Sequence, residues 1–404
     1  MSAPEGGPFA GIPLLEDLPP LEGRRVLLRV DFNVPLRRDE DGTPTEVEDD
    51  FRMRAALPTM SWLVERGAAV TACTHLGRPK GKVDPRYDVA LVRERLAELA
   101  PGVALLENLR FDPGEEDDDP AFVARLVEGF DCYVNDAFGS SHRSHASIVG
   151  PPATLPSAAG RLLEREVAML GRLLADPERP FVAVVGGAKV ADKLGVLRAL
   201  LERVDRLVVG GAMAFTFLVA RGQDPGASLL DVERVAECAA LLADAGDRIL
   251  LPDDVVALAP GGTIGPDGDG EVAVVGADVP DRWQGLDIGP ASAAAFASAV
   301  AEAATVFWNG PMGVFEDPRF AAGTRAVAEA VAACPGFTVV GGGDSAAALD
   351  KMGLADRVGF VSTGGGASLE LLEHGDLPGL VALRDAPNAP GRRGADQAGR
   401  QLGP

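Results

Sequence analysis

The chain has 404 residues, of which 47% are hydrophobic, and carries a formal net charge of -22 at pH 7. This length suggests two domains, and the acidic balance argues against nucleic acid or an anionic membrane surface as a partner. The four cysteines are far apart without a CxxC pair, and no apolar run approaches membrane-spanning length, which predicts a soluble, cytoplasmic protein with reduced thiols.

The first predicted strand, within residues 24–35, brings Asp31 and Asn33 to its carboxyl end. An acidic loop follows, and residues 51–65 then show helical spacing with Arg52 and Arg54 in the first turn. Cations at these positions oppose the helix dipole.

Polar side chains also follow three more predicted strands of the first half. They are His75 and Arg78, then Asn108 and Arg110, then Asp136, His142, Arg143 and His145. In parallel α/β sheets ligands bind beyond the carboxyl ends of the strands, so these side chains should converge on one crevice. Because arginine forks match carboxylate and phosphate geometry, the crevice is predicted to hold a small, multiply anionic molecule.

A proline-rich segment at residues 151–160 separates the two halves, and residues 161–174 form an amphipathic pattern that we interpret as a connecting helix. Beyond residue 180 predicted strands alternate with predicted helices. This alternation is typical of a doubly wound parallel sheet.

The stretch 181–193 predicts a buried strand, a glycine turn and a helix, with Lys189 and Lys193 on one face of the first helical turns. Two of the five lysines of the chain therefore lie beside bare backbone donors, which predicts a phosphate site. The stretch lacks the GxxxxGK[ST] pattern of a Walker A loop, so nucleotide chemistry here must be built differently.

Five strands of the second half end in glycine clusters, which expose backbone donors and allow a ligand to approach closely. Asp344, directly after three of these glycines, is placed to hold Mg²⁺ beside a phosphate; the alternative is that it caps a helix. Glu316 could accept hydrogen bonds from ribose hydroxyls.

Nine motifs in fixed order make the chain resemble the phosphoglycerate kinase family. They span residues 18–380 and read RVDFNVP, THLGRPKG, LLENLRF, NDAFGSSHRSHAS, VVGGAKVADK, LDIGP, WNGPMGVFE, GGGDS and STGGGASLELLE. The resemblance implies two Rossmann-like doubly wound domains joined by a helix. Residues 1–158 would bind 3-phosphoglycerate, 159–176 would form the interdomain helix, and 177–383 would bind nucleotide, with the chain end returning to the first domain.

The resemblance also assigns individual residues. Those implied to hold 3-phosphoglycerate are Asp31, Phe32, Asn33, Arg52, His75, Leu76, Gly77, Arg78, Arg110, His142 and Arg143. Those implied to hold ATP or ADP are Lys189, Lys193, Gly210, Gly211, Asn309, Glu316, Gly342, Gly343, Asp344 and Ser345, with Mg²⁺ on Asp344 and ribose on Glu316.

The implied reaction is the reversible glycolytic transfer of a phosphoryl group between ATP and the carboxylate of 3-phosphoglycerate, giving ADP and 1,3-bisphosphoglycerate. The acceptor carboxylate is already ionised at pH 7, so the reaction needs no general base. Catalysis would consist of neutralising charge with Arg52, Lys189, Mg²⁺ and the amides of Gly365 and Gly366, after a hinge closure that expels water. We expect a monomer.

Two departures from the family pattern stand out. The chain lacks some tens of residues near 99–103, which predicts a missing strand beside Arg110, and residues 384–404 have a composition that predicts a disordered tail. A catalytically silent homologue that binds nucleotide or anions therefore stays open as an alternative. A dinucleotide-dependent dehydrogenase is disfavoured because no GxGxxG motif opens a βαβ unit.

Overall fold

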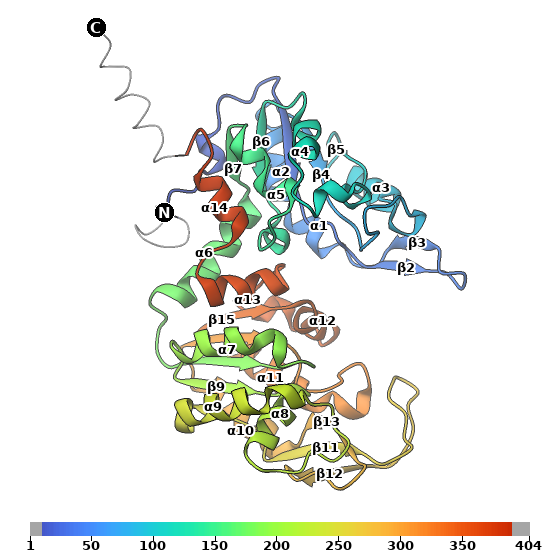
Figure 1. Cartoon of the computed structure of the whole chain (residues 1–404), viewed down its shortest axis with the longest axis vertical. Coiled ribbons are helices and arrows are strands. Elements are labelled where there is room, and N and C mark those ends of the chain that lie inside the picture. Colours follow the sequence, from blue (N-terminus) through green and yellow to red (C-terminus); the bar gives the residue numbers. More distant parts are fainter. Residues whose placement is uncertain (1–9, 390–404) are drawn as a thin grey trace. The chain divides into compact units, whose positions relative to one another are not determined.

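A computed structural model describes residues 10–389 and divides them into two compact units, each with its own parallel sheet (Figure 1). The first unit comprises residues 10–171 together with 374–389, and the second comprises Arg172–Glu373. Both are α/β units of the Rossmann-like, doubly wound kind, as the sequence predicts.

The sheet of the first unit has five parallel strands in the order β5-β4-β1-β6-β7. The strands are β1 (Arg25–Arg29), β4 (Ala69–Cys73), β5 (Ala104–Leu105), β6 (Cys132–Asn135) and β7 (Ser157–Ala159). Every residue of β6 and β7 is buried, which is expected for a parallel sheet covered on both faces. A small antiparallel hairpin, β2 (Leu36–Arg38) with β3 (Pro44–Val47), extends from it.

Helices cover both faces of this sheet. They are α1 (Phe51–Ala55), α2 (Leu57–Val64), α3 (Ala90–Leu99), α4 (Pro120–Val127), α5 (Ala146–Val149), α6 (Arg161–Ala175) and α14 (Pro378–Arg384). Val26 and Leu28 of β1 pack with Met60 and Val92 in one core, while Tyr133 of β6 points to the other face and donates to a carbonyl of α5.

The second unit has a six-stranded parallel sheet in the order β10-β9-β8-β14-β15-β16 and an antiparallel sheet in the order β12-β11-β13. The parallel strands are β8 (Phe181–Val185), β9 (Arg206–Val209), β10 (Ile249–Leu250), β14 (Thr305–Asn309), β15 (Phe337–Gly341) and β16 (Phe360–Val361). The antiparallel strands are β11 (Asp254–Leu258), β12 (Val272–Gly276) and β13 (Gln284–Ile288).

The helices of the second unit follow these strands in the alternating order that the sequence predicts. They are α7 (Leu194–Leu201), α8 (Met213–Ala220), α9 (Val235–Ala245), α10 (Pro290–Ala301), α11 (Ala322–Ala333), α12 (Gly343–Lys351) and α13 (Gly365–His374). Trp308 and Phe307 of β14 are fully buried on the two sides of the strand, so both faces of the sheet carry core.

The chain passes between the units twice, within α6 and at the end of α13. After the second passage α14 packs against β7 and α5, and Figure 1 shows this last helix (red) among the elements of the first unit. The expected disorder does not begin at Arg384. Ala386 and Ala389 are both buried. The side chain of Asn388 accepts a hydrogen bond from the amide of Ser157 at 2.8 Å. The rest of that predicted tail, 390–404, lies outside the described residues.

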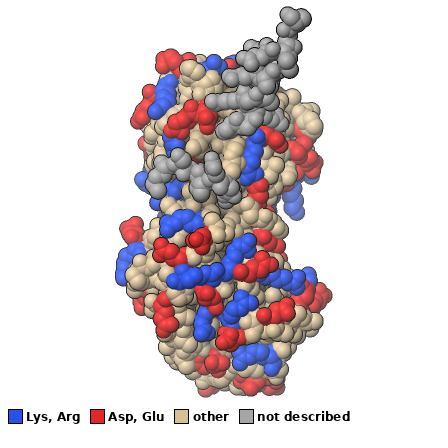
Figure 2. Space-filling view, turned by 90° about the vertical axis from the view of Figure 1, so that its left-hand side faces the viewer, with Lys and Arg blue, Asp and Glu red and all other residues tan. Residues whose placement is uncertain are grey.

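Charged side chains of both signs are interspersed on the face shown in Figure 2. Within residues 10–389 no helix is long and apolar enough to cross a membrane.

Candidate functional site

The turns after β1, β4 and β6 meet because β1 pairs with β4 on one side and with β6 on the other. Asp31 accepts from the Arg52 guanidinium at 3.1 Å and from the Ser140 hydroxyl at 3.2 Å. The side chain of Asn33 accepts from the amide of Gly77 at 2.9 Å. The strand ends that the sequence singles out are thus joined by direct hydrogen bonds.

Arg110 enters the same cluster from a short 3-10 helix, Leu109–Phe111. Its Nη1 donates to the carbonyl of Gly77 at 2.8 Å, and its Nε lies 3.1 Å from a carboxylate oxygen of Glu116. The guanidinium is almost fully buried, so Arg110 is not a solvated surface arginine.

Several guanidinium groups of this cluster lie close enough together to act on one another and on His145. Burial lowers the pKa of Arg110, and the neighbouring Arg143 and Arg29 lower it further against the effect of Glu116. Burial together with the charges of Arg110, Arg143 and Arg29 also lowers the pKa of His145 to about 4. A bound anion would relieve this repulsion.

The remaining titratable groups agree with that picture. Burial is the main reason that the pKa values of His75 and His142 are lowered, so both rings are neutral at pH 7 and offer N–H donors without added charge. Burial alone would raise the pKa of Asp31, but the charges of Arg52 and Arg29 and the bond that Asp31 accepts from the amide of Asn33 hold this pKa well below its usual range.

Arg29 is the main residue of this cluster that the sequence did not single out. It is fully buried, its Nη2 lies 3.3 Å from Nδ1 of His75, and its Nε donates to the Ser147 hydroxyl at 2.8 Å. Ser147 in turn donates to the buried carboxylate of Glu115 at 2.7 Å. The sequence feature that could have identified Arg29 is its place directly after three apolar strand residues, where a buried arginine requires a partner.

The other residues assigned to the first site differ in how far they are buried. Phe32 and Leu76 are buried and present backbone groups, whereas Arg78 is exposed. The amide of Leu76 donates to the side chain of Asn108 at 3.2 Å, which fixes the turn after β4. Nε of Arg143 lies 3.1 Å from Nε2 of His142.

The second cluster lies at the carboxyl ends of β9, β8, β14, β15 and β16, which are neighbours in that order. The sheet order reverses around β8, and such a reversal opens a crevice for ligands. Gly187, Gly211, Gly310 and Gly342 all have positive φ, which lets the backbone turn sharply there. The amide of Gly186 donates to the carbonyl of Asn309 at 2.9 Å, so two of the glycine turns are in contact.

Lys193 reaches back into these turns. Its Nζ donates to the carbonyl of Gly186 at 2.7 Å and to the side chain of Asn309 at 2.8 Å. Burial lowers its pKa to about 8, although Asp344 and Asp192 act in the opposite direction. An ammonium group whose charge is disfavoured by burial is well placed to gain from a phosphate.

The predicted position of Lys189 on the first turns of a helix is wrong. The segment after β8 first forms a loop and a 3-10 turn, Ala191–Lys193, and α7 begins only at Leu194. The φ of +107° at Gly187 turns the chain out of helical geometry, so exposed Lys189 lies on the loop before the helix.

The glycine turns after β15 and β16 approach each other: a Cβ placed on Gly365 would lie 3.6 Å from the Cα of Gly342. The hydroxyl of Ser345 accepts from the amide of Gly310 at 2.6 Å. Asp344 and Gly366 are exposed in the first turns of α12 and α13, Gly343 begins α12, and Glu316 is also exposed. Gly210 and Gly211 follow β9 directly.

Within the described part of the chain, no group of three or more histidine, cysteine, aspartate or glutamate side chains could hold a metal. A metal that arrives bound to phosphates and takes a single protein carboxylate, as Mg²⁺ commonly does, needs no such group. The carboxylate of Asp344 lies near enough to Lys193 for its charge to act on the pKa of that lysine in the upward direction.

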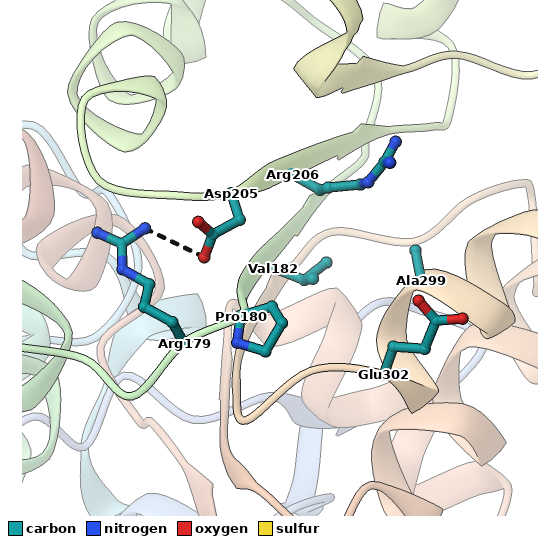
Figure 3. Close-up of a pocket in the computed structure, with 7 residues that line it drawn as sticks. All are labelled: Arg179, Pro180, Val182, Asp205, Arg206, Ala299 and Glu302. Carbon is teal, nitrogen blue, oxygen red and sulfur yellow. Dashed lines mark ion pairs between the residues drawn. The ribbon is translucent and has the colours of Figure 1, made fainter.

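A separate hollow of the second unit lies at the amino ends of β8 and β9, on the opposite edge of the sheet (Figure 3). Arg179 and Asp205 form an ion pair at 3.1 Å on one side of it, and Glu302 lies on the other. It contains none of the residues assigned above, so it is not part of either cluster.

The chain is similar to known proteins over most of its length. The sequence model of the family described as Phosphoglycerate kinase matches residues 15–103 and 100–375. The two pieces meet where the chain is expected to be shortened.

Two curated relatives, both described as phosphoglycerate kinase, match most of the chain. The one from Frankia alni is 52% identical over 395 residues and covers 89% of this chain and 97% of its own. The one from Rubrobacter xylanophilus is 50% identical over 386 residues and covers 90% of this chain and 96% of its own.

Solved structures of two further phosphoglycerate kinases share the fold. The structure from Coxiella burnetii has a TM-score of 0.79 at 37% identity and covers 92% of this chain and 98% of its own. The structure from Pyrococcus horikoshii has a TM-score of 0.80 at 32% identity, with coverage of 93% and 99%.

Proposed function

The chain belongs to the phosphoglycerate kinase family, and from this premise we propose that its two clusters divide the family's reaction between them. The protein transfers a phosphoryl group between ATP and the carboxylate of 3-phosphoglycerate, a step of glycolysis. The arginine and histidine cluster of the first unit holds 3-phosphoglycerate, and the glycine turns of the second unit hold ATP or ADP. The observation that carries this division is that direct hydrogen bonds join Arg52, Arg110 and Asn33 to the turns at the strand ends of the first unit.

In the first cluster the arginines grip the two anionic ends of 3-phosphoglycerate. Arg110, Arg143 and exposed Arg78 supply forked donors, and the neutral rings of His75 and His142 add single donors. Asp31 is acceptor-only at neutral pH because its pKa is held low, so it orients Arg52 and accepts from a substrate hydroxyl. Asn33, Phe32, Leu76 and Gly77 shape the turns around them.

In the second cluster Lys189 and Lys193 contact the phosphates, and the amides that begin α12 and α13 complete the anion site. Glu316 accepts from the ribose, and Gly210 and Gly211 allow the nucleotide to lie close to the backbone. Asp344 would hold Mg²⁺, which neutralises phosphate charge when it is bound.

The chemistry requires positioning more than proton transfer. The carboxylate of 3-phosphoglycerate is ionised at neutral pH, so no side chain has to deprotonate the nucleophile. Arg52, Lys189 and the amides of Gly365 and Gly366 neutralise charge on the group in transit. Because the two clusters belong to different units, transfer requires a closure that excludes water and brings the reacting atoms to about 3 Å.

An assay of 1,3-bisphosphoglycerate formation coupled to its reduction tests the function directly. We expect turnover that depends on ATP, 3-phosphoglycerate and Mg²⁺ together. A protein that binds nucleotide in calorimetry but shows no turnover would instead be a silent homologue, and the proposal would fail.

Arg52→Ala and Lys189→Ala test the roles of the two charged groups. Each removes a donor aimed at developing charge, so each should lower kcat by two to three decades, on the order of 3 kcal/mol, while the fold survives. Arg54→Ala is the matched control, because Arg54 lies on the same helix but pairs with Asp50 at 2.8 Å. Wild-type turnover in either test variant would remove that residue from the mechanism.

We further propose that the protein acts as a monomer in the cytoplasm, without a nucleic-acid or membrane partner. The net charge of -22 supports the last two points. Sedimentation equilibrium should give the mass of one chain, 41.8 kDa, and a mass of two chains would contradict the proposal.

A further inference from the structure

The loop that follows β6, residues 136–143, is bonded to α6, within which the chain passes between the units, and to α14, the helix that follows the second passage. Its far end carries His142 and Arg143 of the anion cluster. Its beginning contacts the start of α6, and its middle contacts the start of α14. The proposed function uses neither contact.

Asp136 makes the first contact. It is fully buried, and its Oδ1 accepts from the amides of Leu162 at 2.9 Å and Leu163 at 3.1 Å. These amides belong to the first turn of α6, where helical partners are lacking. A Cβ on Gly160 would lie 2.2 Å from the same oxygen, so the chain reserves this position for glycine.

The carbonyl of Ser141 makes the second contact, accepting from the amide of Gly379 in α14 at 2.9 Å. The approach is close, because a Cβ on Gly379 would lie 2.9 Å from the Cβ of Ser141. The Ser141 hydroxyl also donates to the carbonyl of Ala137 at 3.0 Å, and Asn135 donates to that hydroxyl at 3.2 Å. The loop is therefore internally braced between its two contacts.

We propose that Asp136 and the Ser141–Gly379 contact are positioning elements that couple occupancy of the anion cluster to α6, within which the chain passes between the units, and to α14, which follows the second passage. An anion that binds Arg143 and His142 fixes the loop, and the loop fixes the starts of α6 and α14. This inference rests on the proposed function, since it assumes that 3-phosphoglycerate binds there and that closure precedes transfer. Coupling between two sites typically changes an equilibrium 5- to 150-fold.

Asp136→Ala is the decisive variant, and Asp136→Asn is its conservative partner. Both amides bond to Oδ1, so asparagine retains them and alanine removes them. We expect Asp136→Ala to bind 3-phosphoglycerate alone within threefold of wild type. Its kcat should fall at least tenfold, and the compaction that both substrates together cause in small-angle scattering should be lost. Asp136→Asn should behave as wild type.

Asp119→Ala controls for the loss of any helix cap, because Asp119 accepts from the amide of Ala121 at the start of α4. It should lower the melting temperature while kcat stays within twofold of wild type. If Asp136→Ala keeps kcat within twofold or still compacts, the inference is wrong. It is also wrong if asparagine is as damaging as alanine.

Two further measurements keep the test open should Asp136→Ala fail to fold. Gly379→Ala separates α14 from the loop and should reproduce the loss of kcat with intact 3-phosphoglycerate binding. In the wild-type protein, 3-phosphoglycerate should slow hydrogen exchange at the amides of Leu162, Leu163 and Gly379; unchanged exchange there overturns the coupling. A wild type without turnover would contradict the proposed function itself and is thereby distinguished from a failure of the coupling.

Discussion

Lys193 is a buried lysine of the second unit that has no carboxylate among its hydrogen-bond partners. Its ammonium group is held by a carbonyl and an amide oxygen rather than by a carboxylate, at 2.7 and 2.8 Å. Neutral partners leave the charge only partly compensated, and burial lowers the pKa to about 8. Phosphate would supply the missing negative charge and favour the protonated form.

Nucleotide affinity should therefore depend on pH in a specific direction. Above pH 8 the free protein loses the proton of Lys193, and binding must restore it, so the Kd for MgADP should rise about tenfold between pH 7 and pH 9. Isothermal titration calorimetry measures this directly. Lys193→Arg keeps its charge throughout and should give a flat profile. A flat profile in the wild type would show that Lys193 does not contact the nucleotide.

Asp287 lies in β13 and is buried. It is close to the loop that carries Glu316, because a Cβ on Gly313 of that loop would lie 2.4 Å from Oδ1 of Asp287. Burial raises its pKa to about 7, against the bonds it accepts from the amides of Gly323 at 2.7 Å and Ile288 at 2.9 Å. The unfolded chain ionises near 3.8, so the stability contributed by the protonated form is lost as pH rises from about 4 to 7.

Replacing Asp287 with asparagine should remove this pH dependence. Relative to the wild type, Asp287→Asn should gain about 3 kcal/mol in the free energy of unfolding between pH 5 and pH 8. Urea unfolding at the two pH values gives the difference. The variant also loses one hydrogen-bond acceptor, which shifts both values equally. Parallel curves for the two proteins would mean that Asp287 ionises normally in the folded state.

At the scale of single elements, some glycine turns are required because no side chain would fit beside the neighbouring turn. Gly310 has a φ of +91°, and a Cβ there would lie 2.4 Å from the carbonyl oxygen of Gly186, the oxygen that holds Lys193. Gly353 has a similar φ of +68° but open space around it. Substituting each glycine in turn therefore distinguishes the effect of backbone strain, which both positions share, from the effect of steric crowding, which only Gly310 has.

Gly310→Ala should weaken ADP binding at least tenfold, because the neighbouring turn and Lys193 must shift to admit the methyl group. Gly353→Ala carries the same kind of backbone strain, of order 1 kcal/mol, and should lower stability without changing the Kd for ADP. Fluorescence titration and thermal unfolding separate the two effects. If both variants lost ADP affinity equally, backbone strain alone would explain the loss, and the predicted role of crowding at Gly310 would be wrong.

Elements were predictable from sequence where a periodic pattern or a strand end identified them. The alternation past residue 180 predicted the parallel sheet, and α6 ends one residue later than its pattern predicted. The start of α7 was not predictable, because a positive φ at Gly187 overrides helix propensity locally. Arg29 was missed for a related reason, since only tertiary structure reveals that its partners are Ser147 and Glu115.

At the scale of the whole molecule, the ordered motifs predicted which half carries which kind of site. They could not predict how far the described chain end packs, because the buried Ala386 and Ala389 belong to no apolar period. β5, a two-residue strand that follows the region expected to be shortened, lies at the edge of the first sheet. In the six-stranded second sheet, β8 and β14, whose carboxyl ends belong to the second cluster, lie in the interior of the strand order.

If each unit carries one substrate, each ligand alone should stabilise only its own unit. MgADP at 100 times its Kd should slow exchange in the second unit by an amount equivalent to about 2.7 kcal/mol and leave β1 and β6 unchanged. Saturating 3-phosphoglycerate should act reciprocally, protecting β1 and β6 but not β8 and β14. Hydrogen exchange followed by mass spectrometry resolves both sheets in one experiment. Protection of β1 by MgADP alone would contradict the division of the substrates between the units, because a site confined to β8 and β14 has no means to stabilise a separate sheet directly.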